Sequence, residues 1–249
     1  MRALTREVPD SFANALCAIA PEVPIDIVTA RAQHAVYRST LASLGVEVTA
    51  LAADHALPDS CFVEDTAVVV DGVALITRPG APTRQAEPSR VADALRKLEC
   101  VYMQAPATLD GGDCMRIGKR IYVGMSARTN AAGVAELQRV FGKDNVVPID
   151  MPSRVLHLKC VCAPLGNDCI TLAYDMIHAS AFGSIDIVRV PGEESYAANV
   201  LAVGANVLVA AGYPRTRDAI AAAGYTPIEL HTTEFRKADG ALTCLSIMY

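Results

Sequence analysis

Apolar and polar positions along the chain follow one order that recurs. In its first complete copy, two apolar runs flank an Asp-Gly pair, which is typical of a β-hairpin over 65–78. A helical face formed by Val91, Leu95 and Leu98 follows, and a further apolar run comes at 100–105. The pattern therefore predicts a unit of strand, strand, helix and strand.

The same order returns three more times, although the helix of the third copy is short. The predicted hairpins span 113–125, 158–174 and 199–212, and the predicted closing strands span 145–150, 186–191 and 226–231. Asn130 and Thr216 are candidate N-caps of helices that end near Gly142 and Gly224.

The fifth copy is split between the two ends of the chain. Its first predicted strand is 244–249, and an N-terminal strand, a helix and a strand at 47–52 supply the rest. The apolar face of that helix is formed by Ala30, His34, Tyr37, Leu41 and Leu44. The five units start near Asp65, Asp113, His157, Asn199 and Cys244, which gives a period of about 45 residues.

Five such units predict a closed α/β ring of ββαβ repeats with pseudo-fivefold symmetry, in which residues 1–249 form a single domain. The C-terminal strand would pair beside the N-terminal segment and close the ring. The ring axis gathers one end of every unit. Residues at the unit starts can therefore meet, although they are far apart in sequence.

Composition narrows the class of protein. The chain has 249 residues, 52% of them hydrophobic, and a net charge of −5, which disfavours nucleic acid or an anionic membrane as a partner. It contains no run of about 18 apolar residues and no secretory signal, so we expect a cytoplasmic protein with reduced thiols.

The eight cysteines do not show the spacing of a zinc site, because no Cys-x-x-Cys pair exists. We expect no metal, and most of these cysteines are interpreted as small core residues. The predicted hairpin over 158–174 places Cys160 and Cys162 in one strand.

Reactive side chains gather at the unit starts. They are Asp59, Glu64, Asp65, Asp110, Asp113, His157 and Cys244. A cysteine, a histidine and a carboxylate that meet in one cleft would supply a nucleophile, its acid–base partner and the group that orients the histidine.

Each of these residues also has a structural interpretation. A single histidine before a strand is often a hydrogen-bonded structural group, a buried cysteine often serves packing, and clustered acids often form a solvated surface. The shared repeat position of Cys244 and His157 favours the functional interpretation. The remaining histidines, His34, His55, His178 and His231, are interpreted as structural.

Several motifs carry a resemblance that runs in order over nearly the whole chain. They are LPDSCFVEDTAVV, ALITRPGAPTR, TLDGGD, VGMSARTNAAG, LHLK, AANVL and KADGALTCLS. Together they resemble dimethylarginine dimethylaminohydrolases, which belong to the guanidine-modifying enzymes. The resemblance implies a five-bladed αβ-propeller, in agreement with the predicted ring.

The resemblance also implies roles for individual residues. Cys244 would be the nucleophile, His157 the general acid and base, and Asp110 the carboxylate that partners the histidine. Glu64 and Asp65 would hold the substrate guanidinium. Asp59 and the backbone carbonyls of Leu16 and Ala238 would hold its α-amino group. Arg84 and Arg128 would hold its α-carboxylate. Residues 6–17 resemble the mobile lid of the family.

The implied reaction is hydrolysis of asymmetric dimethylarginine and monomethylarginine to citrulline and dimethylamine or methylamine, through a covalent thiouronium on Cys244. It requires no cofactor, and the partner is a small guanidino amino acid. Three alternatives stay open: an arginine deiminase, another guanidine-modifying enzyme such as an amidinotransferase, and a non-catalytic ring that binds a partner. A monomer and a homodimer are both compatible with the sequence.

Overall fold

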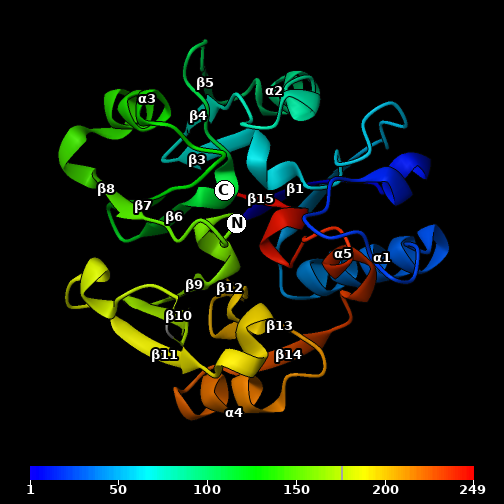
Figure 1. Cartoon of the computed structure of the whole chain (residues 1–249), viewed down its shortest axis with the longest axis vertical. Helices are drawn as coiled ribbons and strands as arrows, with labels where there is room; N and C mark the ends of the chain where they lie inside the picture. Colours follow the sequence, from blue (N-terminus) through cyan, green and yellow to red (C-terminus); the bar gives the residue numbers. More distant parts are fainter. Residues whose placement is uncertain (175) are drawn as a thin grey trace.

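Five small sheets stand around a common axis in the computed structural model, which describes residues 1–174 and 176–249 (Figure 1). Each sheet has three strands. The sheets are β3 (Ala67–Val70), β4 (Val73–Ile76) and β5 (Glu99–Tyr102); β6 (Cys114–Ile117), β7 (Arg120–Met125) and β8 (Val146–Asp150); β9 (Cys162–Gly166), β10 (Cys169–Ala173) and β11 (Asp186–Val190); β12 (Leu201–Val203), β13 (Asn206–Ala210) and β14 (Thr226–Leu230); and β15 (Ile247–Met248), β1 (Arg2–Arg6) and β2 (Glu47–Leu51).

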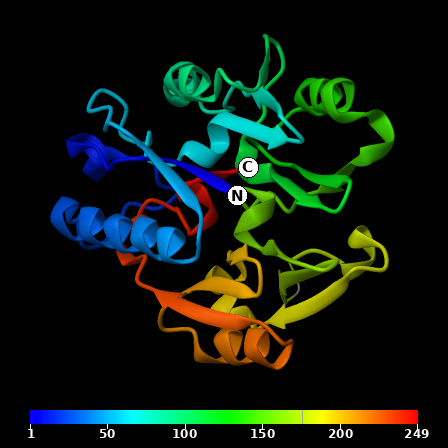
Figure 2. The same cartoon turned by 180° about the vertical axis from the view of Figure 1, so that it is seen from behind.

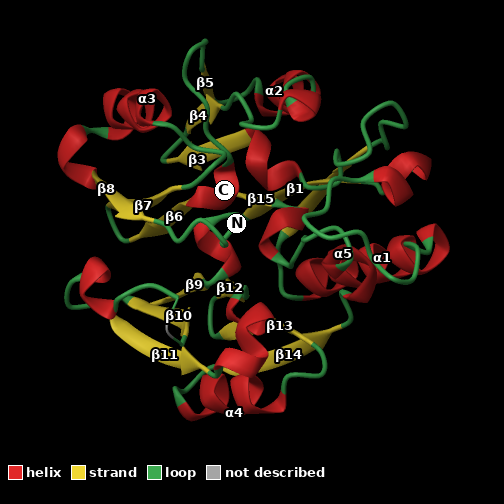
Figure 3. Ribbon diagram, viewed as in Figure 1, coloured by secondary structure: helices red, strands yellow, loops and turns green. Residues whose placement is uncertain are grey.

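Every sheet is paired in the same way. The first strand of a unit pairs antiparallel with the second, and the second pairs parallel with the third. A parallel pair requires a crossover, and a helix supplies it on the outside of the ring (Figure 3). The predicted order of strand, strand, helix and strand is therefore confirmed.

The helices differ in length among the units. The α-helices are α1 (Ile27–Ser43), α2 (Pro88–Leu95), α3 (Ala131–Phe141), α4 (Pro214–Ala222) and the short α5 (Thr233–Arg236). The 3-10 helices are η1 (Asp10–Asn14), η2 (Val63–Thr66), η3 (Pro82–Arg84), η4 (Gly111–Asp113), η5 (Lys143–Asn145), η6 (Leu158–Cys160), η7 (Ala179–Phe182), η8 (Gly192–Ala198) and η9 (Thr243–Leu245). The short helix predicted in the third unit is η7.

One predicted cap is confirmed and one is wrong. The side chain of Asn130 accepts a hydrogen bond from the amide of Gly133, and helix α3 ends before Gly142, whose φ is 92°. Helix α4 instead begins at Pro214. The Thr216 side chain lies inside it and donates its hydroxyl proton to Glu194 of the neighbouring segment, so tertiary contact replaces the cap.

The split unit closes the ring. Strand β15 pairs antiparallel with β1, so that Ala3 lies opposite Met248 and Leu4 opposite Ile247. Both chain ends consequently lie at the centre of the ring, as seen from either side (Figures 1 and 2). The predicted closing role of the C-terminal strand is confirmed.

Two predicted strands reach less far than expected. Cys244 lies in η9 rather than in the closing strand, and Cys160 ends η6 while Cys162 begins β9, so these two cysteines do not lie in one strand. In all five units a 3-10 turn precedes the inner strand. The inner strands converge on the axis, and the chain turns there instead of extending.

The apolar core lies between units rather than inside them. The described residues form five buried clusters, and each combines side chains of two neighbouring units. In one of them the ring of His34 packs on Tyr37 and Phe235, and burial lowers its pKa to about 3, so this histidine is neutral and structural, as expected.

The described residues contain no helix that is long and apolar enough to span a membrane. All eight cysteines lie within these residues, and every one of them is a free thiol.

Ring closure predicts a measurable stability effect. Ile247→Ala removes a side chain that is 4% exposed and packs between β15 and the first unit, so we expect the free energy of unfolding to fall by about 2–5 kcal/mol. Val36→Ala on the exposed face of α1, where the side chain is 52% exposed, should change it by less than about 0.5 kcal/mol. Equal urea midpoints for the two variants would contradict the closing role of β15.

Candidate active site

Polar contacts at the axis join each unit to the next. The amide of Gly112 donates to Asp65 Oδ1 at 2.9 Å, and the amide of Thr243 donates to Asn199 Oδ1 at 3.0 Å. These pairs are 47 and 44 residues apart, close to the repeat period. The 3-10 turns before the inner strands therefore bring the unit starts together, as the sequence predicts.

A small pocket lies at this end of the axis, with a volume of about 30 Å³. Its wall contains most of the predicted site residues. It is lined by Leu16, Asp59, Phe62, Asp65, Arg84, Arg128, Leu156, His157, Ala238, Asp239, Gly240 and Cys244. Asp110 lies behind His157, and Glu64 faces the opposite side of the axis.

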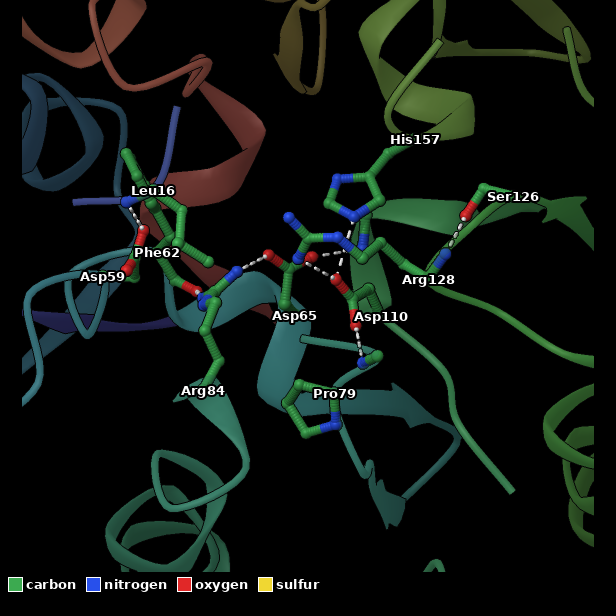
Figure 4. A network of polar contacts seen from close by, with 12 residues as sticks. Leu16, Asp59, Phe62, Asp65, Pro79, Arg84, Asp110, Ser126, Arg128 and His157 are labelled. Atoms are coloured by element: carbon green, nitrogen blue, oxygen red, sulfur yellow. Dashed lines mark hydrogen bonds and ion pairs between the residues drawn. The ribbon is translucent and has the colours of Figure 1, made fainter. Parts of the chain in front are cut away.

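His157 and Asp110 form the central pair of the site. His157 Nε2 lies 2.9 Å from Asp110 Oδ2, and the Asp110 side chain is completely buried (Figure 4). Asp110 Oδ1 also accepts the amide of Gly80 at 2.8 Å, while Arg128 Nη1 lies 3.3 Å from Oδ2. These contacts fix the carboxylate, which in turn orients the imidazole ring.

The environment favours a protonated histidine. Burial alone would lower the pKa of His157, but the charge of Asp65, the hydrogen bond to Asp110 and the charge of Asp113 outweigh it and raise the pKa to about 9. His157 is therefore an imidazolium at neutral pH. It can donate a proton to a departing group and later recover one.

Cys244 is half-buried on the wall of the same pocket. Burial raises the pKa of its thiol well above the ordinary value, and the charges of Glu64 and Asp65 raise it further. The resting group is consequently a neutral thiol. A cation that enters the pocket would oppose the two carboxylates and favour the thiolate.

Asp65 and Arg84 form a buried ion pair beside the pocket. Arg84 Nη1 donates to Asp65 Oδ2 at 2.6 Å (Figure 4), and its other nitrogens donate to Glu87 and to the carbonyl of Phe62. Burial opposes the charge of Asp65, but His157 and Arg84 lower its pKa to about 2. Asp65 therefore stays ionised.

Residues 15–18 cover the pocket. The amide of Leu16 donates to Asp59 Oδ1 at 3.0 Å, and the amide of Ala18 donates to Asp239 Oδ2 at 2.6 Å. The carboxylate predicted to hold an α-amino group is thus occupied by a backbone amide. With residues 15–18 in this position, the pocket has room for water but not for an amino acid.

Glu64 does not line this pocket and instead lines a larger cavity of about 1010 Å³. Its carboxylate accepts hydrogen bonds from Lys159 Nζ and from Thr243 Oγ1, and all three residues line the larger cavity. The predicted contact between Glu64 and a guanidinium requires that it act from behind Cys244, and it stays a prediction.

One group of side chains in the described part of the chain could hold a metal ion. Ligand atoms of Asp65, Asp110 and His157 lie within 4.8 Å of one another. Arg84 already pairs with Asp65, and Arg128 lies beside Asp110. A metal would have to compete with both guanidinium groups.

Comparison with known proteins identifies the family. The family profile described as N,N dimethylarginine dimethylhydrolase, eukaryotic, matches residues 9–235. A relative from Pseudomonas aeruginosa, N(G),N(G)-dimethylarginine dimethylaminohydrolase, is 37% identical over 90% of each chain, and one of the same name from Streptomyces coelicolor is 36% identical over 99% of this chain and 96% of its own. The chain belongs to the dimethylarginine dimethylaminohydrolase family.

A solved structure agrees with this assignment. It shows the Pseudomonas aeruginosa dimethylarginine dimethylaminohydrolase as a cysteine-to-serine variant in complex with citrulline. It matches this chain with a TM-score of 0.95 at 34% identity and covers 100% of this chain and 98% of its own. The five-bladed αβ-propeller of the dimethylarginine dimethylaminohydrolases is therefore the fold of this chain.

Sequence reasoning missed several residues of this dimethylarginine dimethylaminohydrolase site. Lys159 and Thr243 hold Glu64, Glu87 holds Arg84, and Asp239 holds the covering segment. Lys159 lies two residues after the unit start His157, and Thr243 directly precedes Cys244, so the repeat position was a usable signal for both. Glu87 lies three residues after Arg84, which is a usable spacing for an ion pair, whereas nothing in the spacing pointed to Asp239.

The charges around His157 give a testable titration in this family member. Asp65→Asn removes a negative charge and should move the pKa of His157, followed by NMR of its ring protons, downward from about 9. Since the ordinary value is 6.5, protonation of His157 stabilises the fold fully below pH 6.5, and this contribution is lost as pH rises through about 9. An unchanged ring titration in Asp65→Asn would contradict this charge coupling.

Close packing around the imidazole gives a second test. A Cβ on Gly112 would lie 2.8 Å from both His157 Nδ1 and Asp65 Oδ1, so Gly112→Ala should displace the ring from Asp110 and lower the pKa of His157. Gly192→Ala is the matched control, because its added methyl meets nothing within 4 Å. A ring titration in Gly112→Ala equal to that of the control would show that His157 is not held as described.

Proposed function

We propose that this chain hydrolyses asymmetric dimethylarginine and monomethylarginine to citrulline and dimethylamine or methylamine. One observation carries the proposal. Cys244 and His157, which is bonded to Asp110, lie on the wall of one pocket, and the ionised carboxylate of Asp65 lines the same pocket. Membership of the family and the citrulline complex of the Pseudomonas aeruginosa relative support the same substrate class.

The cationic end of the substrate would lie beside Cys244. Asp65 on the pocket side and Glu64 behind it are the carboxylates assigned to the guanidinium. Their negative charge also raises the pKa of Cys244. A bound cation would offset that charge, lower the pKa of the thiol and so favour the thiolate. Substrate binding and nucleophile activation are therefore one event.

The amino-acid end of the substrate would lie under the covering segment. We assign the α-amino group to Asp59 and the carbonyls of Leu16 and Ala238, and the α-carboxylate to Arg84 and Arg128. Arg128 is 19% exposed on the pocket wall, whereas Arg84 is 4% exposed and already bonded to Asp65 and Glu87. Arg128 is thus the more accessible of the two for a charge-assisted contact.

In the first half of the reaction, the Cys244 thiol loses its proton to solvent when the cation binds, and the resulting thiolate attacks the guanidinium carbon and forms a C–S bond. The C–N bond to the methylated nitrogen breaks as the His157 imidazolium gives its proton to the departing amine. The products of this half are a thiouronium on Cys244 and a neutral His157. Asp110 keeps the imidazole in place throughout.

In the second half, neutral His157 takes a proton from a water molecule, which attacks the thiouronium carbon. The C–S bond breaks and releases citrulline, so that Cys244 recovers its thiol and His157 its charge. Residues 6–17 resemble the mobile lid of the family, and we assign to residues 15–18 the movement that admits the substrate.

We also propose that the protein acts in the cytoplasm on small guanidino amino acids and that residues 1–249 form a single domain. Pairing of β15 with β1 supports the single domain. Light scattering would distinguish the monomer from the homodimer, both of which the ring accommodates.

Product analysis tests the function directly. We expect citrulline and dimethylamine from asymmetric dimethylarginine, identified by mass spectrometry, and no turnover by Cys244→Ser, because a serine hydroxyl is far less acidic than a thiol. Faster release of ammonia from arginine would replace the proposal with an arginine deiminase. No product from any guanidino amino acid would favour a non-catalytic ring.

The reactivity of the eight thiols gives an independent test. Chloroacetamidine carries a cation and should label Cys244 first, whereas neutral iodoacetamide should label the exposed Cys17 first, because the pKa of Cys244 is raised in the free protein. Peptide mapping after short exposure measures both orders. If chloroacetamidine labelled another cysteine before Cys244, the covalent mechanism would be wrong.

A further inference from the structure

We propose that Asp113, which does not touch the pocket, is a positioning residue that holds three parts of the active site in register. The inference rests on the proposed function, since it assigns Asp113 a role in that reaction. Asp113 is the last residue of η4, three positions after Asp110, and it is completely buried.

The Asp113 carboxylate accepts three hydrogen bonds. Oδ1 accepts the amide of Leu158 at 3.0 Å, and Oδ2 accepts the hydroxyls of Ser126 and Thr129, each at 2.6 Å. All three donors are neutral groups. A carboxylate in this setting binds its donors more strongly than a neutral acceptor would.

Each donor also supports a different part of the site. Leu158 directly follows His157, so its amide fixes the chain that carries the imidazole. Thr129 Oγ1 accepts the amide of Asp110 at 3.3 Å. The third donor, Ser126, accepts the amide of Arg128 through its Oγ at 3.0 Å (Figure 4).

One carboxylate therefore links the acid–base histidine, the carboxylate that orients it and an arginine of the pocket wall. These three residues come from the loops before β6, after β7 and before η6. Loops are the most mobile parts of a fold, and a shared buried anchor removes that freedom. Displacement of a reacting group by about 1 Å can cost about 100-fold in rate.

Close packing fixes the position of the Asp113 carboxylate. A Cβ on Gly124 of β7 would lie 2.8 Å from Asp113 Oδ1 and 3.0 Å from Leu158 Cβ, so only glycine lets the strand approach this closely. Asp113 also acts through charge, because with Asp65 and Asp110 it raises the pKa of His157. Position and protonation of the histidine thus depend on the same carboxylate.

Steady-state kinetics of Asp113→Asn test the role. We expect kcat for asymmetric dimethylarginine to fall about 100-fold, because His157 and Asp110 lose their support, and KM to rise as well, because Arg128 is held through Ser126. The loss of activity on the alkaline side should also shift to lower pH, since removal of the charge lowers the pKa of His157. Wild-type kcat and an unshifted pH profile in a folded Asp113→Asn protein would overturn the proposal.

Thr129 provides a test that does not depend on the stability of Asp113→Asn. Thr129→Val removes one hydroxyl of the network and should lower kcat, whereas Thr129→Ser keeps the hydroxyl and should restore most of it. Thr171→Val is the control, because it removes a buried hydroxyl from β10 and should lower stability without lowering kcat. Equal kcat in Thr129→Val and Thr129→Ser would overturn the proposal.

The outcomes separate this inference from the proposed function. If wild-type protein turned over no methylated arginine, the function would fail, and the NMR titration of His157 in Asp113→Asn would still test the anchor. A pKa of His157 equal to that of wild type would then count against Asp113. A lowered pKa with disturbed ring resonances would support its positioning role independently of turnover.

Discussion

Compensation of buried charge at the ring axis is the constraint on which the active site depends. Asp65, Asp110 and Asp113 are almost completely buried, and all three raise the pKa of His157. Burying an unpaired charge is costly, so each carboxylate requires donors. Arginines and hydroxyls of the same unit and backbone amides of neighbouring units supply them, and the protonated His157 completes the balance. The groups that perform the proposed chemistry are thus the groups that make burial of these charges tolerable.

The fold was largely predictable because its signals are local and repeated. Hairpin turns, the Asn130 cap and the alternating apolar runs each report on a few consecutive residues, and the period of the units indicated which starts would meet. The same reasoning brought Cys244, His157 and Asp110 to one place. It overestimated the strands near the axis, because convergence of five inner strands is a property of the ring and not of any single unit.

Contacts between units set the limit of sequence reasoning. The side chain of Glu64 turns toward Lys159, which lies 95 residues later in the chain and in another unit. Thr216 illustrates the same limit. Its residue type favours a cap, but the buried carboxylate of Glu194 offers its hydroxyl and amide a better partner inside the helix. Such choices depend on three-dimensional neighbours that no local pattern contains.

The split unit has a consequence for synthesis of the chain. Strand β1 is synthesised before its antiparallel partner β15, which comes about 240 residues later. The apolar clusters between units also require neighbours on both sides. A growing chain therefore carries an open ring with an unpaired edge strand until β15 has been made. Since Cys244 lies just before β15, the proposed nucleophile and the strand that closes the ring become available together.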